Sequence, residues 1–329
     1  MKEKTYEKEA AFLSPYAKQS KDTLGRLREE VPCTMRTDFQ RDRDRIIYSK
    51  AFLRLKNKTQ VFFAPDGDHY MSRLTHTLDV SQIARSLARG LSLNEDLTEA
   101  IALGHDLGHT PFGHIGERVL NSLCPTGFKH SVQSLRVVDE LEKDGRGLNL
   151  TFEVRDGILN HPASGKPATL EGAVVSLADR IAYINHDIED AIRAGVLHAE
   201  ELPKRAVNVF GRSTSVRINT AIQDICSESE GKPFVRMSEE KTEALNELRS
   251  FMFERVYEHA NKLIQESAER MLHALFTYFT ERPEKLPAVY QKTAETDVPR
   301  ATCDYLSSMT DNYAIDIFKE LFVPREGSV

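Results

Sequence analysis

Apolar residues recur at steps of three and four along most of this chain, and long stretches of alternating β-branched residues are rare. Such spacing is typical of α-helices that bury one face. The clearest helix is predicted over residues 169–194, and Gly195 provides its stop. The apolar stripe of this helix consists of Val174, Leu177, Ala178, Ile181, Ile184, Ile188, Ala191 and Ile192. The pattern therefore predicts a mainly α-helical protein.

Further helices are expected on both sides of this one. One should cover residues 70–89, with Leu74, Leu78 and Leu87 on its buried side. A second should start near residue 94 or 98 and end near Gly108. Later helices are predicted over residues 238–263 and 266–279, with a last short helix over 310–321. The segments predicted as loops or connections are 140–150, 227–235 and 283–292.

With 329 residues, 40% of them hydrophobic, the chain has enough apolar material for a real core. No stretch reaches the roughly 18 to 20 apolar residues that a membrane span needs, and the first residues lack the apolar centre of a signal peptide. Cys33, Cys124, Cys226 and Cys303 show no CxxC spacing, so we expect reduced thiols rather than disulfides or a thiolate zinc site. We therefore expect a soluble, cytoplasmic protein without a membrane partner.

The charge balance argues against a protein that wraps generally around nucleic acid. Lys and Arg number 44 against 50 Asp and Glu, which gives a net charge of -6. Segment 36–54 is nonetheless basic, because it holds Arg36, Arg41, Arg43, Arg45, Lys50 and Arg54. These side chains either meet phosphates or alternate with aspartates on a solvated helix, and charge alone does not decide between the two.

Histidines gather in one part of the chain. Eight of the eleven lie within residues 69–186. The dipeptide His-Asp occurs twice, which is a weak signal, but His105-Asp106 stands at a predicted break between helices. His76 lies on the helix before this break, and Asp179 lies on the long helix after it. Three helices can thus bring two histidines and two aspartates to one point.

Two imidazoles and two carboxylates form a mixed nitrogen and oxygen donor set. Such a set suits Mn²⁺, Fe²⁺, Ni²⁺, Zn²⁺ or Mg²⁺ and leaves positions open for water and a phosphate oxygen. The ion would polarise a phosphoryl group and lower the pKa of a bound water towards neutrality. The arrangement therefore points to hydrolysis of a phosphate compound.

The string HDLGHTPFGHIGE, residues 105–117, is the strongest signal in the sequence. Its Gly and Pro residues turn the chain sharply while presenting three histidines and a glutamate. If a helical turn follows, His114 and Glu117 lie three residues apart, where the carboxylate can orient the ring as a general acid or base. The alternatives are histidines that cap a helix end, and a zinc site from His105 and His109 at i and i+4.

Together with segments 36–45, 58–62, 73–77 and 178–183, this string resembles the HD-domain deoxynucleoside triphosphate triphosphohydrolases, the bacterial dGTPase-like proteins. The resemblance implies an all-α HD-domain helical bundle with a C-terminal helical extension. The implied parts are an N-terminal segment 1–35, an HD catalytic core 36–200 and a helical C-terminal region 201–329. The last region would complete the fold and contribute to oligomer contacts.

The resemblance also implies roles for individual residues. The metal ligands would be His76, His105, Asp106 and Asp179, and the catalytic pair would be His114 and Glu117. The substrate contacts would be Arg73, His109 and His130 at the α-phosphate, Arg180 at the phosphate tail, and Gln60, Tyr183 and Asp187 at the sugar. Tyr183 would exclude a 2′-hydroxyl, and Gln60 and Asp187 would bond the 3′-hydroxyl.

Helix geometry supports part of this assignment independently. Asp179, Tyr183 and Asp187 step by four, so they share one face of the predicted helix. Arg73 lies three residues before His76, so the two side chains point the same way. The alternatives are a solvated charged face beside the apolar stripe and, for Arg73, an ordinary surface arginine.

The implied activity is metal-dependent hydrolysis of deoxynucleoside triphosphates, of dGTP or several dNTPs, to the deoxynucleoside and inorganic triphosphate. A Mg²⁺ ion would arrive with the triphosphate. A second dNTP would be a candidate activator, and the chain would form a dimer-based homo-oligomer, up to a hexamer. Base preference and the native metal stay open.

Two alternative functions remain. Another HD phosphohydrolase, either a nucleotide monophosphatase or a cyclic-nucleotide phosphodiesterase, would share the metal ligands, although Gln60, Arg73 and Tyr183 argue against it. A non-catalytic protein that binds nucleotides or single-stranded nucleic acid would use the basic segment 36–54.

Overall fold

The computed structural model of the chain describes residues 1–60, 70–257 and 262–324. Most of these residues are helical, and the only β-type pairings among them are isolated bridges. The predicted all-α class is therefore confirmed. In chain order the helices are α1 (Lys2–Phe12), α2 (Asp38–Ile47), α3 (Lys50–Arg54), α4 (Arg73–Gly90), α5 (Glu95–Gly104), α6 (Gly113–Leu123), α7 (His130–Arg136), α8 (Glu142–Gly145), α9 (Phe152–Asn160), α10 (Leu170–Arg193), α11 (Lys204–Phe210), α12 (Thr214–Ser229), α13 (Glu239–Met252), α14 (Lys262–Glu281), α15 (Ala288–Ala294), α16 (Val298–Ser308) and α17 (Asp311–Phe322). Short 3₁₀ and π-helical segments lie between some of them.

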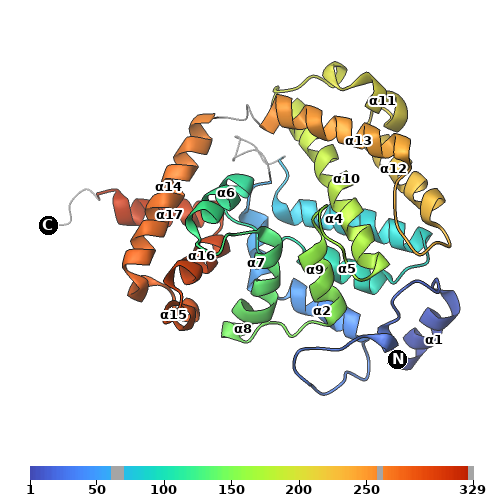
Figure 1. Ribbon diagram of the computed structural model, residues 1–329, viewed down its shortest axis with the longest axis horizontal. Helices are drawn as coiled ribbons and strands as arrows, with labels where there is room; N and C mark the ends of the chain where they lie inside the picture. The colour runs from blue at the N-terminus through green and yellow to red at the C-terminus, as the bar shows by residue number, and fades with distance from the viewer. Residues whose placement is uncertain (61–69, 258–261, 325–329) are drawn as a thin grey trace.

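The long helix α10 runs through the centre of the fold (Figure 1). Thr169 caps its start by accepting a hydrogen bond from the Gly172 amide at 3.1 Å. The helix packs against α4, which packs in turn against α5. The residues of the predicted stripe that are at most 1% exposed are Val174, Ala178, Ile181, Ile184, Ile188 and Ala191, whereas Ile192 at its end is exposed. The helix predicted over 169–194 is therefore confirmed within one residue at each end.

Helix α4 differs from its prediction in its start and in its buried face. Ser72 caps the helix, so that it begins at Arg73 rather than at residue 70. Leu78, which the sequence places on the buried side, is 51% exposed. The buried face instead includes the polar residues Arg73, His76 and Thr77. The spacing of apolar residues cannot predict which face of a helix is buried when that face consists partly of polar side chains.

Helices α15 and α16 each have a proline at or next to their first residue. Helix α15 follows Pro287 directly, and α16 carries Pro299 in its first turn. The connection predicted over 283–292 is therefore wrong. The first turn of a helix needs no amide hydrogen from proline, and the fixed φ of proline suits a helix start.

The helix predicted over residues 238–263 is divided. Helix α13 ends at Met252, and a π-helical segment, Phe253–Tyr257, follows it. Residues 258–261 lie outside the described residues, and α14 resumes at Lys262. The predicted helix over 266–279 corresponds to the later part of α14.

The helices enclose two apolar cores. The larger core lies between α2, α4, α5, α9 and α10 and includes residues of α11, α12 and α13. The second core joins α6 to α14, α16 and α17, which lie at one end of the molecule (Figure 1). The larger core thus contains residues from both sides of position 200, and a domain boundary at that position stays a prediction.

Polar contacts fasten the C-terminal helices to the chain near residue 110. Asp311, at the start of α17, accepts hydrogen bonds from the Phe112 and Thr59 amides, both at 2.9 Å. Lys58 is buried and donates to the backbone carbonyl of His109 and, at 2.7 Å, to that of Ser307. Burial lowers the pKa of Lys58 well below its usual value. The C-terminal helices therefore hold the segment that carries the histidine string.

None of the helices among the described residues combines the length and the apolar character needed to cross a lipid bilayer. All four cysteines are free thiols, and Cys124 and Cys303 are buried.

We predict that Asp311→Ala destabilises the fold. The cost should be roughly 1–3 kcal/mol for each buried amide that loses its acceptor. Urea unfolding followed by far-UV circular dichroism measures this loss. The control is Asp316→Ala, which removes an exposed carboxylate from the same helix and should leave the unfolding midpoint unchanged. Equal midpoints for the two variants would show that the Asp311 contacts do not hold this segment.

Candidate active site

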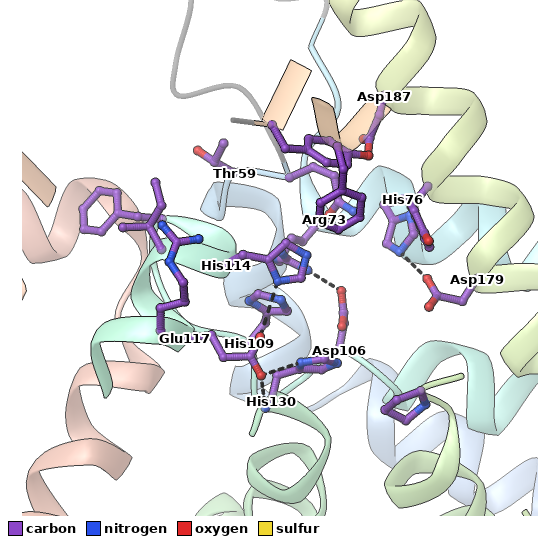
Figure 2. A pocket seen from close by; sticks show the side chains of 18 of the residues that line it. Thr59, Arg73, His76, Asp106, His109, His114, Glu117, His130, Asp179 and Asp187 are labelled. Atoms are coloured by element: carbon purple, nitrogen blue, oxygen red, sulfur yellow. Dashed lines mark hydrogen bonds and ion pairs between the residues drawn. The ribbon is translucent and has the colours of Figure 1, made fainter. Parts of the chain in front are cut away.

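The polar residues to which the sequence assigns a role line one cavity of about 1100 Å³, except for His105, which lies directly behind its wall against Asp106 and Asp179. Its wall comes from the start of α4, the histidine string, the start of α7, the residues after α9, one face of α10, and α13 with the π-helical segment that follows. Figure 2 shows Arg73, His76, Asp106, His130 and Asp179 gathered around this space. Segments far apart in the sequence thus contribute to one site.

The HD turn, residues 105–112, folds tightly against α7. The Gly108 amide donates to Ser134 Oγ at 2.9 Å, and Ser134 Oγ donates to the His105 carbonyl at 2.7 Å. A Cβ atom at position 108 would lie 2.1 Å from the Ser134 amide nitrogen, so only glycine fits this approach. Phe112 then takes a left-handed φ of 59° before α6 starts. These contacts fix the directions in which the side chains of the turn point.

Four side chains form the first donor cluster. His76 Nε2 lies 3.1 Å from Asp179 Oδ1. His105 Nε2 lies 3.8 Å from that oxygen and 3.7 Å from Asp106 Oδ1. His76, His105 and Asp106 also offer one ligand atom each within 4.8 Å of one another. Three helices thus bring together the residues to which the sequence assigns a metal ion, and that role stays a prediction.

The donors of this cluster suit a divalent cation. His105 donates its Nδ1 hydrogen to a backbone carbonyl at 2.7 Å, so its buried Nε2, without a hydrogen-bond partner in the described part of the chain, presents a lone pair. Burial alone would raise the pKa of Asp106, but His105 and Arg73 hold it well below its usual range. Burial would also raise the pKa of Asp179, but His76 and His105 lower it to about 2. Two ionised carboxylates and two imidazoles therefore fit the ion.

Glu117 is the centre of a second group of side chains (Figure 2). Its carboxylate lies 3.4 Å from His114 Nδ1 and accepts a hydrogen bond of 2.9 Å from His130 Nδ1. Burial would raise the pKa of Glu117, but hydrogen bonds from His114 and His130 hold it far below its usual range. His114 is largely exposed, whereas His130 stacks on buried His109 with the ring centroids 4.9 Å apart. The predicted pair is in contact, and His130 is the closer partner of the carboxylate.

Arg73 is buried, so it is not the surface arginine that the sequence allows. Only 2% of it is exposed, and its Nη1 donates to Asp106 Oδ2 at 2.5 Å. His109 is equally buried, and burial together with nearby Arg73 lowers its pKa well below the usual value. Its donor neighbours are Glu117 and His130, whereas His105 belongs to the first cluster. The structure therefore gives no support to a zinc site from His105 and His109.

The polar side chains of α10 do not form a solvated face. His186, Asp187 and Asp190 are at most 8% exposed. His186 Nε2 lies 2.5 Å from Asp79 Oδ2, and Asp187 accepts a hydrogen bond from the Tyr257 hydroxyl. Burial raises the pKa of Asp187 to about 7. The alternative of a charged surface is therefore wrong for this part of the helix.

The remaining predicted contacts also belong to the cavity wall. They are Gln60, Arg180, Tyr183 and Asp187. Arg180 hydrogen-bonds to the Asn246 side chain in an exposed position. Gln60 Oε1 is buried and has no hydrogen-bond partner among the described residues, which leaves it available to a ligand. Contacts of these residues with a substrate stay predictions.

No sequence pattern singles out four other residues of the wall, His161, Arg249, Phe253 and Tyr257. The last three step by four, and the Arg249 guanidinium lies over the Phe253 ring at 5.0 Å. This spacing indicates that the three residues share one helical face, but the sequence does not show that this face packs near α10. His161 follows the last residue of α9, a position for which periodicity gives no signal.

The basic segment 36–54 pairs with carboxylates of the same chain. Arg43 Nη1 lies 3.4 Å from Asp96 Oδ1, and Arg45 Nη2 lies 2.7 Å from Glu30 Oε1. No residue of the segment is among the described residues that line the cavity. The pairings favour an ion-paired helix over a phosphate-binding segment.

Comparison with known proteins agrees with this geometry. The model of the HD domain matches residues 73–184, and that of the phosphohydrolase-associated domain matches residues 235–320. A protein of Caldanaerobacter subterraneus subsp. tengcongensis named deoxyguanosinetriphosphate triphosphohydrolase-like protein is 57% identical over 98% of this chain and 96% of its own length. Proteins of the same name from Clostridium tetani and Bordetella pertussis are 47% and 40% identical, over 96% and 94% of this chain and 95% and 96% of their own lengths.

The match to the HD domain includes all four members of the first donor cluster, and HD domains bind divalent metals. The relatives match along almost the whole chain rather than in the HD domain alone. The chain therefore belongs to the family of deoxyguanosinetriphosphate triphosphohydrolase-like proteins, which are HD-domain hydrolases.

Proposed function

We propose that the protein is a metal-dependent dNTP triphosphohydrolase, which cleaves dGTP or several dNTPs to the deoxynucleoside and inorganic triphosphate. The observation that carries the proposal is a cluster of two histidines and two carboxylates at the wall of one cavity, which a buried arginine and further histidines also line. The names of the relatives, which mention deoxyguanosine triphosphate, support the substrate class.

The first donor cluster would hold the divalent ion through His76, His105, Asp106 and Asp179. Mn²⁺, Fe²⁺, Ni²⁺, Zn²⁺ and Mg²⁺ are all suited to this donor set. When bound, such an ion supplies Lewis acidity to a phosphoryl oxygen and lowers the pKa of a water molecule. A Mg²⁺ ion carried by the triphosphate itself is part of the proposal.

Arg73, His109 and His130 would stabilise charge at the α-phosphate. All three line the cavity, and Arg73 places a permanent positive charge at a buried position. Phosphoryl transfer spreads negative charge over the equatorial oxygens, and fixed donors stabilise that charge more strongly in a buried site than in bulk water. Arg180, which is half-buried at the wall, would hold the outer phosphates.

His114 and Glu117 would move the proton. Despite its burial, Glu117 is ionised because hydrogen bonds from His114 and His130 lower its pKa. The carboxylate lies 3.4 Å from His114 Nδ1, where it would orient the ring. That ring can donate its proton to the 5′ oxygen of the leaving group, while His130 keeps the carboxylate in position.

The wall formed by α10 would recognise the sugar. Tyr183 and Asp187 lie one turn apart on this helix, and both line the cavity with Gln60. The Tyr183 ring would leave no room for a 2′-hydroxyl. Gln60 Oε1 and the Asp187 carboxyl would bond the 3′-hydroxyl, and the Tyr257 hydroxyl adds a polar group beside them.

We also propose a dimer-based homo-oligomer in the cytoplasm, with a second dNTP as candidate activator. Apolar side chains remain exposed along and after α17, namely Tyr313, Phe322 and Val323, which supports self-association. Free thiols suit a reducing compartment. Light scattering at micromolar concentration that showed a monomer would contradict the assembly.

The test of the proposed function is the product released from each of the four dNTPs and the matching ribonucleotides, with Mn²⁺ or Mg²⁺ present. We expect inorganic triphosphate from at least one dNTP and much slower release from the ribonucleotides. Pyrophosphate or orthophosphate as the sole product would assign a different phosphohydrolase reaction. Salt-sensitive binding of oligonucleotide without any turnover would favour a nucleic-acid-binding protein.

His105→Ala should abolish both metal binding and turnover. The loss of several kcal/mol of transition-state stabilisation corresponds to at least about a thousandfold fall in kcat. Metal content is measured by mass spectrometry after gel filtration, and turnover by triphosphate release. The control is His198→Ala, which removes an exposed histidine outside the cavity and should keep both. A His105→Ala protein with its metal and full rate would contradict the cluster assignment.

Glu117→Gln should slow turnover without removing the metal. General acid or base catalysis contributes about 10²–10⁴-fold, and Gln cannot stabilise a protonated imidazole as a carboxylate does. We expect a fall at least as large for His114→Ala, because this change removes the proposed proton donor itself. Ser122→Ala, at an exposed position of the same helix, is the control. A full rate in Glu117→Gln would remove the proton-transfer role.

Asp187→Asn should change how stability depends on pH. The pKa of Asp187 is about 7 in the folded protein against an ordinary value of 3.8, because the carboxyl is buried. Between these two values the folded state therefore binds more protons than the unfolded state. Because of this residue, the free energy of unfolding falls by about 1.4 kcal/mol per pH unit as the pH rises through that range. Urea unfolding at several pH values should show a shallower fall in Asp187→Asn. Equal slopes for wild type and variant would refute the raised pKa.

A further inference from the structure

The second His-Asp dipeptide of the sequence, His186-Asp187, lies on α10, and its histidine is not among the described residues that line the cavity. His186 is nevertheless buried, with 8% of the residue exposed. Its Nε2 atom lies 2.5 Å from Oδ2 of Asp79, a residue of α4. A buried imidazole that faces a carboxylate thus connects the two helices that carry His76 and Asp179.

Two contacts between a histidine and an aspartate join α4 to α10, and their directions are opposite. In the first donor cluster, His76 of α4 lies 3.1 Å from Asp179 of α10 (Figure 2). In the other contact the aspartate belongs to α4 and the histidine belongs to α10. Asp79 follows His76 by three residues, so the two side chains lie on the same side of α4. The contact outside the cavity therefore lies next to a predicted metal ligand.

The ring of His76 lacks the hydrogen bond that usually orients a metal-binding histidine. Such a histidine almost always donates the hydrogen of its other ring nitrogen to a carboxylate, a backbone carbonyl or water. His105 meets this rule, because its Nδ1 donates to the Ala102 carbonyl at 2.7 Å. His76 Nδ1 is buried and has no hydrogen-bond partner among residues 1–60, 70–257 and 262–324. Packing against neighbouring side chains therefore has to orient this ring.

Two other imidazoles pack edge to face against His76. The His105 ring centroid lies 5.6 Å away at an interplanar angle of 67°, and the His186 centroid lies 5.9 Å away at 87°. Each of these rings has a polar contact of its own, His105 with a backbone carbonyl and His186 with Asp79. Because both rings are buried and held in this way, they limit how far the His76 ring can turn.

We propose that Asp79 and His186 are positioning residues for the metal ion. Asp79 holds the imidazole of His186, and that ring keeps the Nε2 atom of His76 directed at the first donor cluster. Neither residue contacts the ion or the substrate in this arrangement. The inference deepens the proposed function and rests on its metal site. Residues that act through a metal ligand in this way typically change metal affinity by about 10–100-fold when they are replaced.

The experiment measures the dissociation constant of Mn²⁺ by calorimetry, with the metal-free full chain and without nucleotide. We expect His186→Ala to weaken binding about 10–100-fold, because His76 loses the ring that packs against it. His186→Phe keeps an aromatic ring at this place and should recover most of the loss. Asp79→Ala, which frees the His186 ring, should fall between the wild type and His186→Ala. The control His198→Ala, at an exposed position, should bind Mn²⁺ as the wild type does.

Urea unfolding of the same metal-free proteins separates positioning from a purely structural role. If the pair only stabilised the packing of α4 on α10, His186→Ala would lower the free energy of unfolding but leave the Mn²⁺ affinity of the folded protein unchanged. Unchanged affinity in Asp79→Ala and His186→Ala would overturn the proposal, and so would equal losses in His186→Ala and His186→Phe. The Asp79 side chain is 30% exposed, so its removal tests the proposal even if His186→Ala folds poorly.

The same samples separate this inference from the proposed function. Unchanged Mn²⁺ affinity in the variants, with triphosphate release by the wild type, contradicts the positioning role and leaves the dNTP triphosphohydrolase in place. Weaker Mn²⁺ binding in the variants, without triphosphate release from any dNTP by the wild type, supports the positioning role and contradicts that activity. A wild-type chain that binds no Mn²⁺ would overturn both.

Discussion

The ionised carboxylate of Asp106, almost fully removed from water, is the constraint on which the site depends. Burying such a charge costs several kcal/mol unless nearby cations and hydrogen bonds offset the loss of hydration. Arg73 supplies a direct ion pair, and His105 stands on the other side of the carboxylate. These partners keep the oxygen atoms charged and fixed, and fixed charged oxygens with imidazole nitrogens beside them are what a divalent cation requires.

The turn that carries Asp106 is held from two directions. On one side Ser134 of α7 bonds to the backbone of the turn, and Gly108 makes that approach sterically allowed. On the other side Lys58 and Asp311 bond to its later part and to the start of α6. Because Asp311 belongs to α17, the C-terminal helices support the geometry of the cavity as well as forming a core of their own.

Local sequence patterns predict those features of the structure that a single helix determines. The stripe of α10 and the four-residue steps of Asp179, Tyr183 and Asp187 follow from helix geometry alone, and these three side chains do line one cavity. His161 and Tyr257 could not be foreseen, because their neighbours come from remote segments and a residue at a helix end has no periodic signal. The apolar pattern places Leu78 on the wrong face for a related reason, since the buried face of α4 is partly polar.

The most direct measurement of the central claim is anomalous diffraction from crystals of the protein grown with Mn²⁺. The account predicts an anomalous peak bonded to His76, His105, Asp106 and Asp179. Well-ordered side chains at these positions with no peak between them, in crystals that bind manganese elsewhere or not at all, would contradict it.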